Sequence, residues 1–171
     1  IEAEDNLIFK SLNAIKKHCK VDKGIQIHLK KIIPVGAGLG GGSSNAATTL
    51  IALNKIWGLN LSSKELAHIG KNIGADVPVF IYGKNAKATG IGDIFADIEL
   101  ERNKFLLICP NIEVSTSKMF RKLEIHELDP KYQNSFLNIL LKEYKSIEDF
   151  YMSFISQYDL KLSGTGSTFF V

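Results

Sequence analysis

Apolar residues recur at helical spacing near the start of the chain. Between residues 4 and 19 the recurring apolar positions are Leu7, Ile8, Leu12 and Ile15. This spacing predicts an amphipathic helix over 4–19. Two acidic residues, Glu4 and Asp5, suit the positive N-terminal end of that helix.

Three further helical regions are predicted from caps and periodicity. Apolar positions at helical spacing indicate a helix over about 43–57, which a glycine follows. Ser62 stands three residues before Glu65, the spacing of a capping box, and this predicts a helix over about 62–73. Two helical stretches together fill roughly 134–157.

Strands are predicted where the apolar pattern alternates or forms a short run. Ile25, Ile27 and Leu29 alternate with polar residues, which indicates a half-buried strand. Residues 79–82 form a short apolar run and are expected to be a strand as well. Residues 105–108 are expected to form a buried strand that the following proline ends.

Turn residues organise the rest of the chain. A hairpin-like region is predicted where glycines occur at positions 83, 90 and 92. Strands are predicted at 160–162 and 168–171, on either side of a glycine-containing turn at 163–166. Polar residues at 101–104 separate two regions that each mix helices with strands.

Composition excludes several classes of protein. The chain has 171 residues, 45% of them hydrophobic, and a net charge of +3. Its lysine pairs are too short for a nucleic-acid-binding stripe, and its apolar runs are too short to span a membrane. The chain begins without a signal-peptide pattern, so a cytoplasmic protein is expected. The cysteines, Cys19 and Cys109, are expected to be free and mostly buried, and the four histidines show no metal-binding spacing.

The stretch PVGAGLGGGSSN, residues 34–45, holds five glycines directly before a predicted helix. A glycine inside regular structure costs about 0.5–1 kcal/mol relative to alanine, so this density indicates that the backbone closely approaches something. A helix start offers free N–H groups and a positive dipole end. The stretch therefore predicts a site for an anion such as a polyphosphate.

Two familiar phosphate motifs do not fit this stretch. Gly36, Gly38 and Gly41 satisfy G-x-G-x-x-G, but a second helix follows where a dinucleotide-binding fold needs a strand. The spacing of a Walker loop is also present, yet Gly42 and Ser43 stand where lysine and a hydroxyl residue are required.

The pattern P-x-x-x-G-L-G-G-G-S-S-[DN]-A-A, which begins at Pro34, resembles the phosphate-binding motif of the GHMP kinases. Three more stretches resemble motifs of that family in the same order: residues 4–7 (EDNL), 74–78 (GADVP) and 163–167 (SGTGS). Four ordered matches are far more specific than one glycine motif.

The tripled glycine and paired serine resemble one branch of the family most closely. Those kinases act in the non-mevalonate route to isoprenoid precursors, and they transfer the γ-phosphate of ATP to the 2-hydroxyl of 4-diphosphocytidyl-2-C-methyl-D-erythritol. The resemblance implies an α+β fold. Its N-terminal domain, 1–100, would be like the second domain of ribosomal protein S5, and its C-terminal domain, 101–171, would be ferredoxin-like.

The resemblance also implies which residues bind ATP. Asn6, Leu7 and Lys31 would border the adenine. Gly164, Thr165 and Gly166 would help to close the phosphate site. The residues that would wrap the phosphates are Pro34, Val35, Gly36, Ala37, Gly38, Leu39, Gly40, Gly41, Gly42, Ser43 and Ser44. Mg²⁺ would be held mainly by ATP oxygens and water, with the hydroxyl of Ser44 as a further ligand.

Asp76, in G-A-D-V-P, matches the catalytic aspartate of the family. Phosphoryl transfer needs positioning, charge neutralisation and one carboxylate to orient or deprotonate the attacking hydroxyl. Ile91, Thr116 and Phe120 fall where the family builds its cytidine pocket, and Phe120 would stack on the base. A core role for Phe120 is the alternative that the sequence leaves open.

The sequence departs from the family pattern in one respect. The family has a segment before the E-D-N-L helix that carries a lysine paired with the aspartate, an asparagine that touches the substrate, and a Tyr-His pair for cytidine. That segment is not in this sequence, so we expect a longer natural chain. Two other readings stay open: another GHMP kinase, of the homoserine or mevalonate type, and a non-catalytic nucleotide-binding module. The oligomeric state is left open.

Overall fold

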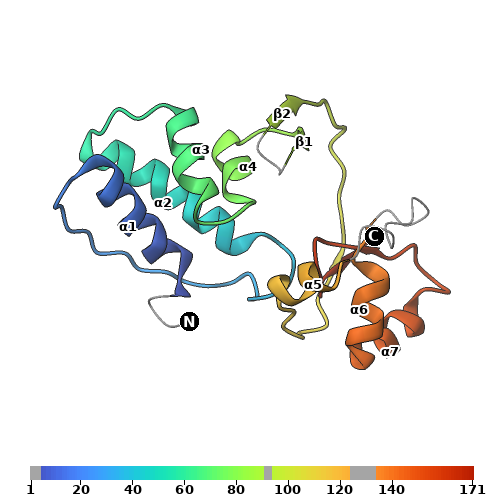
Figure 1. The fold of residues 1–171 in the computed structure, drawn as a ribbon. Coiled ribbons are helices and arrows are strands. Elements are labelled where there is room, and N and C mark those ends of the chain that lie inside the picture. The colour runs from blue at the N-terminus through green and yellow to red at the C-terminus, as the bar shows by residue number, and fades with distance from the viewer. Residues whose placement is uncertain (1–4, 91–93, 124–133) are drawn as a thin grey trace. The chain divides into compact units, whose positions relative to one another are not determined.

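The computed structural model describes residues 5–90, 94–123 and 134–171 of the chain (Figure 1). The described residues form seven helices and five short strands. They divide into two compact units. One comprises residues 1–30 and 41–102, and the other comprises residues 31–40 and 103–171. Because residues 31–40 belong to the second unit, the glycine stretch is shared between the units along the chain.

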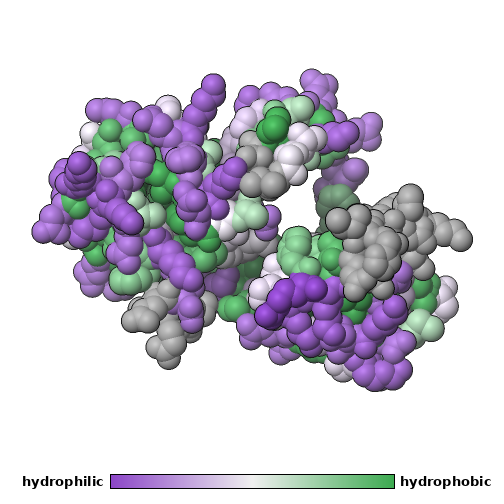
Figure 2. Space-filling view, viewed as in Figure 1, coloured by the Kyte–Doolittle hydropathy of each residue, from purple (hydrophilic) through white to green (hydrophobic). Residues whose placement is uncertain are grey.

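The first unit is built mainly from helices. Its elements are α1 (Leu7–Cys19), α2 (Gly41–Trp57), α3 (Ser63–Lys71), α4 (Val77–Tyr82), β1 (Ala86–Thr89) and β2 (Ile94–Asp97). Helix α1 lies along α2, and the antiparallel β1–β2 hairpin follows α4 (Figure 1). The core is apolar: Ile15, Ala46, Ala47, Leu50, Leu53, Trp57, Leu66, Ile69, Val77 and Ile81. Hydrophilic side chains cover most of the face of these helices seen in Figure 2.

Capping side chains set two of these helix starts, one of them predicted from the sequence. The predicted capping box is confirmed, because the Ser62 hydroxyl accepts from the Glu65 N–H at 3.3 Å and the Glu65 carboxylate accepts from the Ser62 N–H at 2.8 Å. Helix α1 begins later than predicted, at Leu7, because the side-chain oxygen of Asn6 accepts from the Ile8 N–H at 3.0 Å.

The strand predicted at 79–82 is wrong: these residues belong to helix α4. Val77 and Ile81 are four residues apart and both are buried, which is the spacing of one helix face. Gly70 in α3 makes room for them, since a Cβ atom there would lie 2.7 Å from Val77 Cγ1 and 3.0 Å from Ile81 Cδ1. Packing against α3 thus determines the secondary structure of a short apolar run that the sequence leaves ambiguous.

The strand predicted at Ile25, Ile27 and Leu29 is also wrong, because no regular structure occurs from residue 21 to residue 34. Ile27 and Leu29 are each 43% exposed. Alternation alone does not form a strand, because an extended segment needs a neighbour to pair with its N–H and C=O groups. Among the described residues no strand pairs with this segment.

The second unit mixes three helices with a small sheet. Its elements are β3 (Leu107–Ile108), α5 (Thr116–Lys122), α6 (Leu137–Glu143), α7 (Lys145–Phe154), β4 (Lys161–Leu162) and β5 (Phe169–Phe170). Strand β5 lies between β3 and β4 and is antiparallel to both. Its core comprises Val114, Met119, Ile139, Leu140, Ile147, Tyr151, Leu160, Leu162 and Phe169. The two predicted helical stretches and the last strand pair are confirmed.

Two burial predictions for this part of the chain are wrong. The strand predicted at 105–108 shortens to the two residues of the edge strand β3, and Phe105 and Leu106 before it are each 61% exposed. Cys109 beside it is exposed and Cys19 is half-buried, although both are free as expected. None of the helices in the described ranges is long and apolar enough to cross a membrane.

Candidate functional site

The glycine stretch begins as a loop that lies against the turn Ser163–Gly166 within the second unit. Gly36 and Gly38 adopt φ angles of +63° and +71°, which L side chains rarely tolerate. The carbonyl oxygen of Ala37 accepts from the Thr168 N–H at 3.2 Å, and the carbonyl oxygen of Gly38 accepts from the Ser163 hydroxyl at 2.9 Å. Hydrogen bonds therefore fix the loop to the turn.

Gly38 is required by the contact with the turn, and Gly36 is required by a second contact with residues 113–114. A Cβ atom on Gly38 would overlap the carbonyl oxygen of Ser163 and lie 2.8 Å from that of Gly166. A Cβ atom on Gly36 would overlap the Glu113 side chain and lie 3.1 Å from the Val114 nitrogen. The close backbone approach predicted from the glycine density is therefore present here, and at these two positions the group approached is the protein itself.

The turn is equally constrained from its own side. Gly164 and Gly166 have φ angles of +56° and +90°, and a Cβ atom on Gly164 would lie 3.0 Å from the Gly38 carbonyl oxygen. Thr165 is buried, and its hydroxyl lies 3.2 Å from that of Thr116 in α5. The turn predicted at 163–166 thus has a fixed shape, and it connects the loop with α5.

The glycine stretch continues into helix α2 of the first unit. Gly40 has a φ angle of +64° and is the last residue before the helix, which begins at Gly41, slightly earlier than predicted. Residues 41–44 form the first turn, whose N–H groups have no partner within a helix. This turn holds no acidic residue. Free N–H groups, the positive dipole end and the absence of acidic side chains there favour a bound anion.

Asp76 lies within the first unit, at the N-cap position of α4. Its side chain is exposed and makes no capping hydrogen bond. The turn before it approaches the start of α2, since a Cβ atom on Gly74 would lie 3.8 Å from the Ser43 hydroxyl oxygen. The carboxylate of Asp76 is therefore free of a capping role and belongs to a turn beside the predicted phosphate-binding helix start.

The residues predicted to border adenine fall in different units. Asn6 and Leu7 are at the start of α1 in the first unit, where a Cβ atom on Gly42 would lie 3.3 Å from Leu7 Cδ1. The side-chain oxygen of Asn6 accepts the capping bond, which leaves its N–H₂ group and one lone pair of that oxygen for a ligand. Lys31 is half-buried in the second unit.

Phe120 and Thr116, predicted for the cytidine pocket, share helix α5. Phe120 is 58% exposed, and its ring meets that of Phe136 edge to face with centroids 4.9 Å apart. The alternative of a core phenylalanine is therefore wrong, and the ring offers a surface to a ligand. Ile91 lies outside the described residues.

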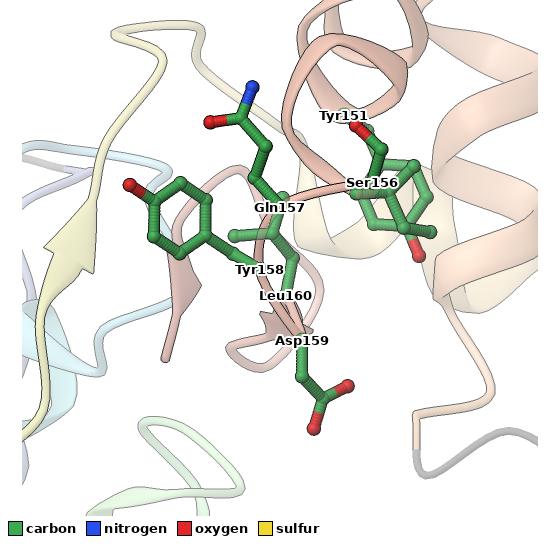
Figure 3. Close-up of a pocket in the computed structure, with 7 residues that line it drawn as sticks. Tyr151, Ser156, Gln157, Tyr158, Asp159 and Leu160 are labelled. Carbon is green, nitrogen blue, oxygen red and sulfur yellow. The ribbon is translucent and has the colours of Figure 1, made fainter.

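A hollow elsewhere in the second unit contains none of the residues predicted for the site. A shallow hollow is lined by seven residues: Tyr151, Ile155, Ser156, Gln157, Tyr158, Asp159 and Leu160 (Figure 3). The carboxylate of Asp159 points away from the two tyrosine rings in this view and pairs with Lys161 at 3.5 Å. In the described ranges no cluster of three or more His, Cys, Asp or Glu residues could hold a metal ion.

Comparisons with known proteins agree with the motifs. Residues 6–84 match the sequence model of the GHMP kinases N terminal domain. A crystal structure titled 4-(cytidine 5'-diphospho)-2C-methyl-D-erythritol kinase superposes with a TM-score of 0.78 and 27% identity, covering 96% of this chain and 68% of that one. Residues 6–84 therefore resemble a GHMP kinase N-terminal domain, and the chain has the α+β fold of the solved kinase. The described part of the C-terminal region contains only part of the ferredoxin-like domain.

Curated relatives narrow the comparison to one kind of kinase. The chain is 41% identical to the 4-diphosphocytidyl-2-C-methyl-D-erythritol kinase of Pseudoalteromonas translucida, across 100% of this chain and 63% of that protein. It is 38% identical to the kinase of the same name from Acinetobacter baylyi, across 99% of this chain and 65% of that protein. The chain thus spans slightly less than two thirds of the length of these relatives.

Sequence reasoning missed one residue that the structure connects to this site. The side chain of Asn134 makes three hydrogen bonds, two of them to the turn at 163–166 or its flank. It belongs to no motif in the sequence, and only the fold brings it to the turn, 30 positions away from its partner Gly164.

Proposed function

We propose that this chain carries out ATP-dependent phosphorylation of the 2-hydroxyl of 4-diphosphocytidyl-2-C-methyl-D-erythritol, a step of isoprenoid precursor synthesis. The observation that carries the proposal is the identity of 38–41% to kinases of that name across essentially the whole chain. The homoserine and mevalonate types are not favoured, because the relatives that match share one substrate name.

Residues 34–44 are proposed to bind the ATP phosphates, with Gly164–Gly166 closing the site. The free N–H groups of the first turn of α2 and its lack of acidic residues support this assignment. The structure changes the reason for the glycines, however. Gly36 lies against residues 113–114 and Gly38 against the turn, which leaves Gly40, Gly41 and Gly42 as the positions where backbone can approach phosphate.

Asp76 is proposed to orient or deprotonate the 2-hydroxyl of the substrate. Its exposure and its lack of a capping hydrogen bond support this role, since a carboxylate engaged in a cap would be a weaker acceptor. Phosphoryl transfer depends on such positioning together with neutralisation of the phosphate charge. Mg²⁺ would supply that neutralisation, held by ATP oxygens and water and by the hydroxyl of Ser44.

Phe120 and Thr116 are proposed to contact the cytidine base, and Ile91 is proposed to complete that pocket. The exposed ring of Phe120 supports stacking, which contributes about 1–3 kcal/mol per base. Asn6, Leu7 and Lys31 are proposed for adenine. Further proposals are the domain division at 100/101, a cytoplasmic location, and the absence of a nucleic-acid partner.

The test is substrate-dependent ADP release by the natural full-length protein and its Asp76→Asn variant. We expect the variant to retain ATP affinity within about twofold and to lose about 10³-fold in kcat, in the range of losses on removing a group used in the transition state. Glu101→Gln is a matched control, since it removes an exposed carboxylate of the first unit outside the glycine stretch. ATP binding without ADP release in the wild-type protein would favour the non-catalytic module, and normal turnover by the variant would remove Asp76 from the mechanism.

A further inference from the structure

We propose that Asn134 is a positioning residue that couples the ATP-binding loop to the aromatic surface that receives the second substrate. The proposal rests on the proposed function, because it assigns a role within the same site. It concerns only residues of the second unit, and no motif of the sequence includes Asn134.

The amide nitrogen of Asn134 bonds to the turn that the glycine loop also contacts. Its Nδ2 atom donates to the carbonyl oxygen of Leu162 at 2.9 Å and to that of Gly164 at 2.8 Å. A side-chain amide has two N–H donors, and both are used here. Leu162 and Gly164 flank Ser163, whose hydroxyl donates to the Gly38 carbonyl oxygen at 2.9 Å. Asn134 and the glycine loop thus both bond to the turn or its flank, through different groups.

The amide oxygen of Asn134 bonds to a different segment, the residues just before α6. Its Oδ1 atom accepts from the Phe136 N–H at 2.9 Å, which fixes the chain just before α6. The ring of Phe136 packs edge to face on that of Phe120, which is the proposed cytidine clamp. One planar side chain therefore bonds both the turn that supports the ATP loop and the residue that supports the clamp.

A single substitution can remove the two donor bonds of the Asn134 amide and keep its acceptor bond. Asn134→Asp keeps an oxygen that accepts from Phe136, but it replaces both donors with a carboxylate that faces two carbonyl oxygens. Asn134→Ala removes both halves. If Asn134 positions the site, the first variant should affect ATP use selectively, and the second should affect both substrates.

The experiment measures kcat and both KM values for the two variants in the natural full-length protein, together with their melting temperatures. We expect Asn134→Asp to raise the KM for ATP about tenfold or more, which is 1.4 kcal/mol or more, and the KM for the cytidine substrate less than about twofold. Asn134→Ala should raise both. Asn138→Asp introduces the same charge change in α6, outside the turn and the loop, and should change neither KM.

A second measurement keeps the proposal separate from the proposed function. Amide hydrogen exchange of the peptide that spans residues 162–168 should be faster in Asn134→Asp than in the wild type and Asn138→Asp, whether or not the protein is a kinase. Equal KM changes for both substrates in Asn134→Asp, or unchanged exchange in that peptide, would overturn the positioning role. Absence of activity in the wild type with faster exchange in the variant would overturn only the proposed function.

Discussion

The contact between the glycine loop and the turn at 163–166 makes a quantitative prediction for Gly38→Ala. Alanine at a φ of +71° costs about 1–2 kcal/mol, because the left-handed conformation brings Cβ close to the carbonyl oxygen. The new methyl group would also overlap the Ser163 carbonyl oxygen, so the loop must move away from the turn.

That movement breaks the hydrogen bonds at Ala37 and Gly38, each worth about 0.5–1.5 kcal/mol. We therefore expect Gly38→Ala to destabilise the second unit by about 2–5 kcal/mol, counting both causes. Gly58→Ala is the matched control. Its φ of +64° carries the same backbone penalty, but a Cβ atom there meets nothing within 4 Å, so we expect only about 1–2 kcal/mol.

The assay is amide hydrogen exchange of the peptides around each site, supported by urea unfolding. The local free energy of opening of residues 162–168 should fall in Gly38→Ala, and that of residues 54–61 should fall less in Gly58→Ala. If the two glycines cost the same to within about 0.5 kcal/mol, the loop does not lie tightly against the turn in solution, and the explanation given for Gly38 is wrong.

Two further predictions concern the substrate clamp and a helix cap. Phe120→Ala should raise the KM for the cytidine substrate about tenfold or more and that for ATP less than about twofold, since a stacked base loses about 1–3 kcal/mol; equal effects would indicate general damage. Ser62→Ala should cost about 0.5–2 kcal/mol in urea unfolding at neutral pH. The Ser62 hydrogen bonds lower the pKa of Glu65. The part of the stabilisation that comes from the Ser62 hydroxyl donating to the Glu65 carboxylate is therefore present above the ordinary carboxyl pKa and is lost as pH falls through the lowered value. A variant deficit that persists unchanged in acid would contradict this.

Much of the fold could be predicted where the signal is local. The capping box of Ser62 and Glu65, the hairpin between β1 and β2, and the turn at 163–166 depend on residues close in sequence, and the structure contains all three. The similarity to the GHMP kinases could be predicted for the same reason, because a contiguous motif keeps its pattern whatever surrounds it. For the candidate site, the sequence indicated the loop, the turn and Asp76, and the structure adds that Phe120 is too exposed for a core role.

What the sequence could not decide depends on partners far along the chain. Residues 79–82 form an apolar run suited to a strand, but they belong to helix α4, whose buried face packs where Gly70 of α3 leaves space. Residues 25–29 have the alternation of a strand, but hydrogen-bonded pairing is a property of two segments, not of one.

The same division holds for the candidate site. The sequence by itself determined that a glycine-rich loop precedes a helix start and that an aspartate follows in G-A-D-V-P, because backbone conformation and local caps depend on neighbouring residues. Only the tertiary structure decided that Gly36 and Gly38 are needed against the protein's own backbone, and that Asn134 bonds the turn 30 positions away. Steric exclusion and hydrogen bonding act through space over a few ångströms, so their partners are set by the fold and not by the order of residues.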